Sequence, residues 1–148
     1  MLVPRLAVAA IAALMLLSTP ACSRNDGPTL SAPDAYGQAQ AGRLTLIDVR
    51  TPDDWRKTGV AKGALRINMA NVGGEAGFIQ QVETALGGNR NAPIGLLGLA
   101  GNRAANAQEV LREAGFTRVY NIKEGMLGGS AGPGWIARKL PVEACPRC

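Results

Sequence analysis

Two of the three cysteines in this 148-residue chain, Cys145 and Cys148, are separated by only two residues. Thiols at this spacing can form a local disulfide, or a disulfide to another chain, when the compartment is oxidising. They can also act as a redox dithiol, although no helix start follows them to stabilise a thiolate. Two thiolates without a histidine leave a zinc site half built. We expect a disulfide, keep thiol exchange as the alternative, and expect no metal.

A second candidate site is a six-residue loop between a predicted strand and a predicted helix. Its residues are Gly98, Leu99, Ala100, Gly101, Asn102 and Arg103. In such a loop successive backbone N–H groups curl around one point, and the helix N-terminus adds partial positive charge. Arg103 can draw a small anion toward these groups, or it can pair with an acid. The loop is therefore a candidate site for a small anion.

Histidine is absent from the sequence. Its absence excludes Ser-His and Cys-His catalytic pairs, c-type haem attachment and His-ligated zinc. Any chemistry must therefore come from Cys, Asp, Arg and the backbone, and we expect no cofactor. Asp48 and Arg50 end a predicted strand, where a carboxylate commonly pairs with a nearby arginine or caps backbone N–H groups. We interpret these two residues as structural support for the neighbouring loops.

The charge of the chain is only mildly positive. The formal net charge is +5, and removal of residues 1–21, whose single charged residue is Arg5, leaves 15 basic and 11 acidic residues. The basic residues are scattered, and no aromatic platform on which bases could stack accompanies them. A solvated basic surface explains this pattern, so we expect no nucleic-acid partner.

The first 21 residues have the pattern of a secretory signal peptide. A short basic start ending at Arg5 precedes an apolar run over residues 6–17, and small residues lead to Ala21 and Cys22. The apolar run is shorter than the roughly 20 residues that span a bilayer. Cys22 resembles the acylated cysteine of bacterial lipoproteins, although Thr19 replaces the usual leucine-like residue. We expect a periplasmic or outer-membrane-anchored lipoprotein, with soluble export after ordinary cleavage as the alternative.

The elements that must position these residues alternate along the chain. Apolar and β-branched runs predict strands at residues 44–49, 64–68, 94–97 and 118–122. Capping residues and helical spacing predict helices that begin after Thr51, over residues 75–86, and from the loop to Ala114. Alternating strands and helices favour an α/β fold with a parallel sheet and helices on both faces. We expect a linker at residues 22–34, one domain at 35–142, and a Cys-x-x-Cys tail at 143–148.

Three segments, in this order, resemble the rhodanese family of sulfurtransferases. The first covers residues 46–55 (LIDVRTPDDW), with Gly59 and Gly63-Ala64 behind it; the second is Gly101-Asn102-Arg103. The third covers residues 115–142 and contains GF, VYNI, EGM, GPGW and LPV. The resemblance extends over about residues 30–142. It implies a rhodanese-like domain whose parallel sheet has about five strands.

In that family a cysteine occupies the first position of the six-residue loop, and an arginine closes it. Counting back from Arg103 places Gly98 at the cysteine position. Glycine has no side chain to hold sulfur, so the resemblance implies a sulfurtransferase-like pseudoenzyme without a catalytic residue in the loop. Leu99 and Ala100 also replace the polar residues that are usual in active loops.

These observations lead to two functional hypotheses. The first is an exported rhodanese-like protein without thiosulfate sulfurtransferase activity, which acts as a binding or partner module. Its ligand would be an unidentified protein or a small anion, and a lipid anchor on Cys22 would hold it at a membrane. The alternative is a sulfur-transfer or thiol-redox enzyme that uses Cys145 and Cys148.

Overall fold

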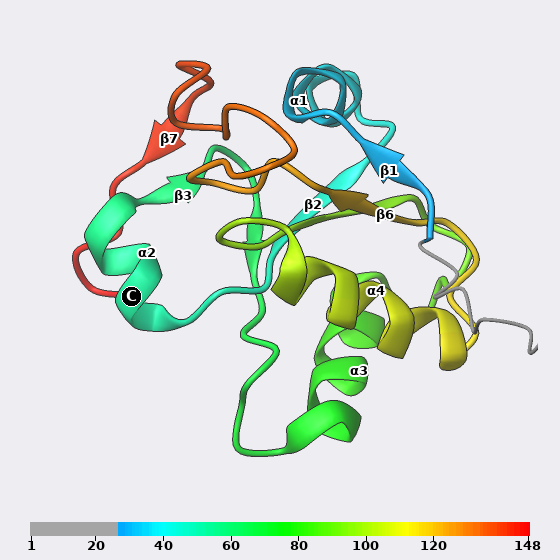
Figure 1. The fold of residues 1–148 in the computed structure, drawn as a ribbon. Coiled ribbons are helices and arrows are strands. Elements are labelled where there is room, and N and C mark those ends of the chain that lie inside the picture. The colour runs from blue at the N-terminus through cyan, green and yellow to red at the C-terminus, as the bar shows by residue number, and fades with distance from the viewer. Residues whose placement is uncertain (1–26) are drawn as a thin grey trace, which may run out of the picture.

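The computed structural model describes residues 27–148, which form an α/β fold around a parallel sheet of five strands (Figure 1). In spatial order the strands are β1 (Thr29–Leu30), β6 (Val119–Ile122), β5 (Ile94–Leu97), β2 (Thr45–Asp48) and β4 (Leu65–Arg66). The helices are α1 (Ala32–Gln40), α2 (Pro52–Thr58), α3 (Gly74–Ala85) and α4 (Asn102–Glu113). The predicted fold class and the parallel sheet are confirmed.

Helices cover both faces of the sheet, because side chains of its central strands alternate between two hydrophobic cores. Ile47 and Leu96 are buried in the core beneath α3 and α4. Leu46 and Leu97, each the sequence neighbour of one of these residues, belong to the opposite core with α1 and Trp135. Figure 1 shows α1 on one side of the sheet and α3 and α4 on the other.

The helix α2 has well-defined ends. The hydroxyl group of Thr51 accepts a hydrogen bond from the Asp54 N–H, and the Asp54 carboxylate accepts one from the Thr51 N–H. The helix ends at Gly59, whose φ is 76°; a Cβ there would lie 2.6 Å from Val142 Cγ1. This close approach accompanies antiparallel pairing of β3 (Val60–Ala61) with β7 (Val142–Glu143). Residues 142–143 are thereby tied to the segment that follows α2.

The folded domain begins earlier than the predicted boundary at residue 35. Thr29 and Leu30, assigned to the linker from sequence, pair with β6, and Ser31 caps α1. The Ala32 N–H also donates to Glu124 Oε2 at 2.8 Å. The linker prediction is therefore wrong for residues 29–34, because long-range pairing with β6 organises a segment whose composition is typical of a loop. Glu143, assigned to the tail, likewise belongs to β7.

Three of the sequence predictions concern residues that the structure does not describe. The signal peptide at 1–21, the acylation of Cys22 and the first part of the linker lie outside residues 27–148. Within residues 27–148, no helix has the length and apolar character needed to cross a membrane.

Candidate functional site

The predicted loop lies between β5 and α4, at the carboxyl end of the parallel strands. Gly101 immediately precedes α4, and its φ of 95° lies in the left-handed region that favours glycine. A Cβ at Gly101 would lie 2.5 Å from the carbonyl oxygen of Lys123. The turn into α4 therefore depends on glycine for two reasons, backbone conformation and space.

The loop carbonyl groups are bound by the segment that follows β6. Met126 and Leu127 donate their N–H groups to the carbonyl oxygens of Gly98 and Leu99, each at 3.0 Å. Gly125 permits this approach, because a Cβ there would lie 2.6 Å from the Leu99 oxygen. Within the part of the chain that the structure describes, the N–H groups of residues 99–104 donate to no protein acceptor. These N–H groups belong to the set of donors that a helix start leaves without a partner inside the helix.

Gly98 is buried, and a side chain at this position would point to the first turn of α4. An ideal Cβ would lie 3.1 Å from Ala104 N and 3.6 Å from Arg103 Cβ. Such a Cβ requires its neighbours to shift by a few tenths of an ångström. The position that the family resemblance assigns to the sulfur-carrying cysteine therefore faces the helix N-terminus in this chain too, but it carries no thiol.

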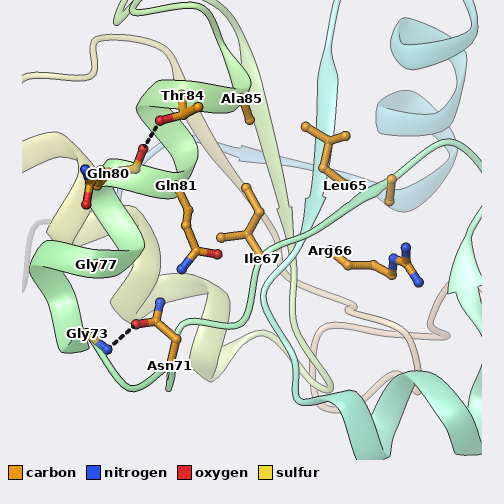
Figure 2. A pocket seen from close by; sticks show the side chains of 11 residues that line it. Leu65, Arg66, Ile67, Asn71, Gly73, Gly77, Gln80, Gln81, Thr84 and Ala85 are labelled. Atoms are coloured by element: carbon orange, nitrogen blue, oxygen red, sulfur yellow. Dashed lines mark hydrogen bonds between the residues drawn. The ribbon is translucent and has the colours of Figure 1, made fainter. Parts of the chain in front are cut away.

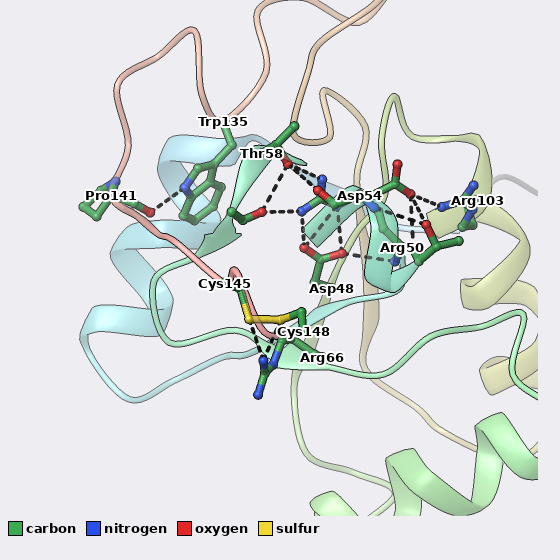
Figure 3. Close-up of polar contacts among 12 residues, drawn as sticks. Asp48, Arg50, Asp54, Thr58, Arg66, Arg103, Trp135, Pro141, Cys145 and Cys148 are labelled. Carbon is green, nitrogen blue, oxygen red and sulfur yellow. Dashed lines mark hydrogen bonds and ion pairs between the residues drawn. A yellow bond between two sulfur atoms is a disulfide. The ribbon is translucent and has the colours of Figure 1, made fainter. Parts of the chain in front are cut away.

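Arg103 projects from the first turn of α4 to α2, where its Nη1 lies 3.1 Å from Asp54 Oδ2 (Figure 3). Burial raises the pKa of Asp54, but hydrogen bonds from Thr51 and the charge of Arg103 outweigh this effect, so the pKa lies below its ordinary value. Of the two roles open to Arg103 from sequence, the structure shows pairing with an acid. The pair joins α4 to the capping box of α2.

Asp48 and Arg50 form an ion pair that has no exposure to solvent. Arg50 Nη2 lies 2.7 Å from Asp48 Oδ2 and 2.8 Å from the carbonyl oxygen of Gly59. Arg50 Nη1 donates to Thr58 Oγ1 at 2.7 Å. These contacts fix the end of α2 against the end of β2 (Figure 3). Asp48 and Arg50 therefore link β2, Thr58 and Gly59.

The sulfur atoms of Cys145 and Cys148 are joined in a disulfide. Both lie beside the guanidinium of Arg66 on β4: the Nη1 atom is 2.8 Å from Cys145 Sγ and 2.7 Å from Cys148 Sγ (Figure 3). Within residues 27–148, no hydrogen bond or ion pair joins these cysteines to residues 98–103. Each of the two sites contacts α2 instead, the disulfide segment through Arg56 and the loop through the pairing of Arg103 with Asp54.

Sequence reasoning missed Arg66 and a groove next to it. The groove lies between β4 and α3 and has a volume of about 620 Å³ (Figure 2). Leu65, Arg66 and Ile67 form one wall, and Gln81 and residues 73–85 of the α3 region contribute to the other. No local motif marks either feature, because Arg66 meets the cysteines across 79 residues of sequence.

A comparison with protein families shows to which family this chain belongs. The model of the rhodanese-like domain matches residues 31–131, which is more than half of the chain. This chain belongs to the rhodanese-like domain family. The predicted resemblance to the rhodanese family is confirmed, and with it the prediction that the domain is of the sulfurtransferase-like type.

Solved structures give the same fold. The crystal structure of Rv0390 from M. tuberculosis is 27% identical, with a TM-score of 0.64, and the match covers 80% of this chain and 98% of that one. The polysulfide-sulfur transferase homodimer from Wolinella succinogenes is 29% identical, with a TM-score of 0.61 and coverage of 80% and 79%. The human single-domain sulfurtransferase is 26% identical, with a TM-score of 0.50 and coverage of 65% and 90%. No curated protein sequence is significantly similar to this chain.

Proposed function

We propose that this rhodanese-like protein does not transfer sulfur from thiosulfate through its loop and instead acts as a binding or partner module. The observation that carries the proposal is Gly98, which faces the start of α4 at the position where family members hold sulfur. Without a thiolate at this point no persulfide can form there. What remains is a loop with backbone donors beside Arg103, whose guanidinium is paired with Asp54.

The surroundings of the loop favour a ligand that combines an anionic group with apolar surface. Leu99 is half-buried and Ala100 is exposed, while Leu127, which is hydrogen-bonded to Leu99, is 51% exposed. A small anion can bind the N–H groups of residues 99–104, and a protein partner can add contacts to these apolar side chains. The ligand of this site is thus a small anion or a protein partner that presents one.

Sulfur transfer from thiosulfate to cyanide tests the proposal. The chain and its Gly98→Cys variant are compared in a background where Cys22, Cys145 and Cys148 are replaced by serine. The parent background should show no turnover, and robust turnover there would contradict the proposal that the loop transfers no sulfur. Binding is tested by titrating sulfate while the amide resonances of residues 99–104 are followed. Shifts there that weaken in Arg103→Gln support an anion site, and unchanged resonances would remove the anion as ligand.

We further propose that the protein is exported and anchored by a lipid on Cys22. The support is the sequence pattern of residues 1–22: a basic start, an apolar run and Ala21 before the cysteine. Replacing Cys22 by serine should move a lipid-anchored protein from the membrane fraction to the soluble fraction. An already soluble exported form would not change, which would leave export without an anchor. Recovery of the chain from the cytoplasm with Met1 intact would contradict both forms of the proposal.

A second candidate function is thiol–disulfide exchange at Cys145 and Cys148. The specific observation in its favour is Arg66, whose guanidinium lies beside both sulfur atoms. A fixed positive charge lowers the pKa of a neighbouring thiol and makes it a better leaving group. Reduction of the disulfide by dithiothreitol, followed by alkylation and mass measurement, tests whether it exchanges. A disulfide that resists reduction in the folded protein would eliminate this function.

A further inference from the structure

We infer that Arg66, Cys145 and Cys148 form an exchange site for a dithiol carried on an extended protein segment, which binds along the open edge of β4. This inference rests on the second function proposed above. It adds to that function the class of substrate, the place where the substrate binds, and the residue that stabilises the departing sulfur.

The geometry of Arg66 serves either sulfur. Its Nη1 atom is 2.8 Å from Cys145 Sγ and 2.7 Å from Cys148 Sγ. Disulfide sulfur is a weak acceptor, so this contact contributes little while the bond is intact. When the bond breaks, the departing sulfur becomes a thiolate next to a guanidinium that is always charged. Arg66 therefore interacts more strongly with the leaving group than with the resting disulfide, which is the condition for catalysis.

An incoming thiol can reach this pair. Both cysteines are half-buried. Arg66 is exposed, and so are Pro146 and Arg147, the two residues between the cysteines. Arg56 of α2 donates to the carbonyl oxygen of Cys148 and holds this segment against the domain. The disulfide is thus fixed in place but open to solvent on one side.

The edge of β4 provides a place for an extended segment. Among the described strands β4 is the last of the sheet. The Ile67 N–H donates to the Asp48 oxygen of β2 at 3.1 Å, so the backbone groups of Arg66, one residue earlier, face away from β2 to the open edge. Unpaired backbone groups at an edge bind another strand by main-chain hydrogen bonds.

The groove and the disulfide both border this edge, since Arg66 belongs to the groove wall and also contacts the cysteines. In Figure 2 the Arg66 side chain extends away from α3, and Figure 3 shows its guanidinium beside the disulfide. A strand added at β4 directs alternate side chains to opposite faces. One set would enter the groove, whose walls include Leu65, Asn71 and Gln81. The other set would lie on the side of Arg66, so a cysteine in it would meet the disulfide.

The proposed step transfers two electrons from the substrate to the protein. A substrate thiolate forms a bond to one sulfur of the Cys145–Cys148 disulfide, the bond between these cysteines breaks, and the other sulfur leaves as a thiolate paired with Arg66. The second substrate thiol loses its proton and attacks the mixed disulfide. The substrate leaves as a disulfide, and Cys145 and Cys148 are reduced, with the two substrate protons passing through solvent to their thiols.

The experiment measures exchange rates in the full chain carrying Cys22→Ser, with three substrates. They are dithiothreitol, a β-prone peptide with a Cys-x-x-Cys dithiol, and the same peptide with proline on both sides of its first cysteine, which blocks pairing to a strand edge. The unmodified peptide should react about tenfold faster than the proline peptide, since edge pairing raises the local thiol concentration. Thr84→Trp, which fills the groove from α3, should remove this advantage and leave the dithiothreitol rate unchanged.

Variants of Arg66 test its role. Arg66→Gln should slow exchange with every substrate about tenfold and raise the pKa of the reduced thiols, because a neighbouring positive charge favours the thiolate. Arg66→Lys should keep part of the exchange rate and part of the lowering of the thiol pKa, because lysine retains the positive charge. The control is Lys57→Gln, which removes one positive charge at an exposed position of α2. It should alter neither the exchange rate nor the pKa of the thiols.

The outcomes separate the two proposals. If no dithiol reduces the disulfide, the exchange function fails and this inference fails with it. If dithiothreitol reacts but both peptides react alike and Thr84→Trp has no effect, exchange stands and the extended-segment substrate is wrong. If Arg66→Gln changes neither rate nor thiol pKa, the assigned role of Arg66 is wrong.

Discussion

A site that handles sulfur needs a sulfur atom and groups that stabilise negative charge. In this protein the loop and the disulfide segment supply these features in different ways. The loop at residues 98–103 has backbone N–H donors and a helix start but no sulfur. The disulfide segment has two sulfur atoms, and its positive charge comes from the side chain of Arg66. A backbone cradle is made by the fold of the chain, whereas an environment made by one arginine side chain depends on that residue.

The two regions also differ in how they are held. The loop is adjacent to the buried Asp48–Arg50 pair, and its carbonyls are bound by residues 126 and 127. The disulfide segment follows the two-residue strand β7 and makes its side-chain contacts among exposed residues. Changes at the loop end should therefore cost more folding free energy than changes at the disulfide.

The largest expected effect is at the buried pair. Arg50→Met leaves the Asp48 carboxylate without its partner inside the protein and should lower the free energy of unfolding by about 3–5 kcal/mol. Arg66→Met, an exposed counterpart, should change it by no more than about 0.5 kcal/mol. Urea denaturation followed by circular dichroism measures both. Similar losses for the two variants would show that the loop end is not the more firmly held region.

The next effect compares the two positive environments directly. In a background without other cysteines, Gly98→Cys should give a thiol whose pKa is about 1–2 units below the unperturbed value of about 8.5. The pKa of the Cys145 thiol in a Cys148→Ser variant should also be lowered. Because Arg66 is exposed, its effect on this pKa should become smaller at high ionic strength. Alkylation rates against pH at low and high ionic strength measure this difference. An ordinary or raised pKa at position 98 would mean that the loop is closed to anions.

Loss of the disulfide should have a smaller effect on stability. The ring that it closes is short, so replacing Cys145 and Cys148 by serine should lower the free energy of unfolding by at most about 2 kcal/mol. The amide resonances of residues 98–104 should stay in place, because no hydrogen bond or ion pair among residues 27–148 directly joins the loop to the two cysteines. Displaced loop resonances in this double variant would show that the sites are coupled.

The smallest effect concerns the Arg103–Asp54 pair. The pKa of Asp54 is lowered in the folded state, so the pair contributes stability above the unfolded pKa, and this contribution is lost as pH falls through the folded pKa. Asp54→Asn should cost under about 1 kcal/mol at pH 7. The difference from the parent should shrink below about pH 4, where the unfolded carboxylate protonates. A difference that is the same at pH 7 and pH 3 would contradict the lowered pKa.

Much of the fold was predictable because its signals are local. The buried runs at β2 and β5, the capping box that begins α2 and the loop before α4 all depend on residues close together in sequence. By contrast, Thr29 and Leu30 are too few to signal a strand and are ordered by pairing with β6, more than 90 residues later. The β3–β7 pair, also made of two-residue strands, was missed for the same reason.

The sequence alone determined the family, the α/β class and the glycine at position 98, because residue identity and order are sufficient for each of these. Tertiary structure decided which charges meet. From the sequence, Arg103 could bind a small anion or pair with an acidic side chain. Only the packing of α4 beside α2 brings it to Asp54. Likewise Arg66 and the cysteine pair lie 79 and 82 positions apart in the chain. Electrostatic contacts depend on distance in space, and that distance is fixed only when the sheet edge and the segment after β7 have folded together.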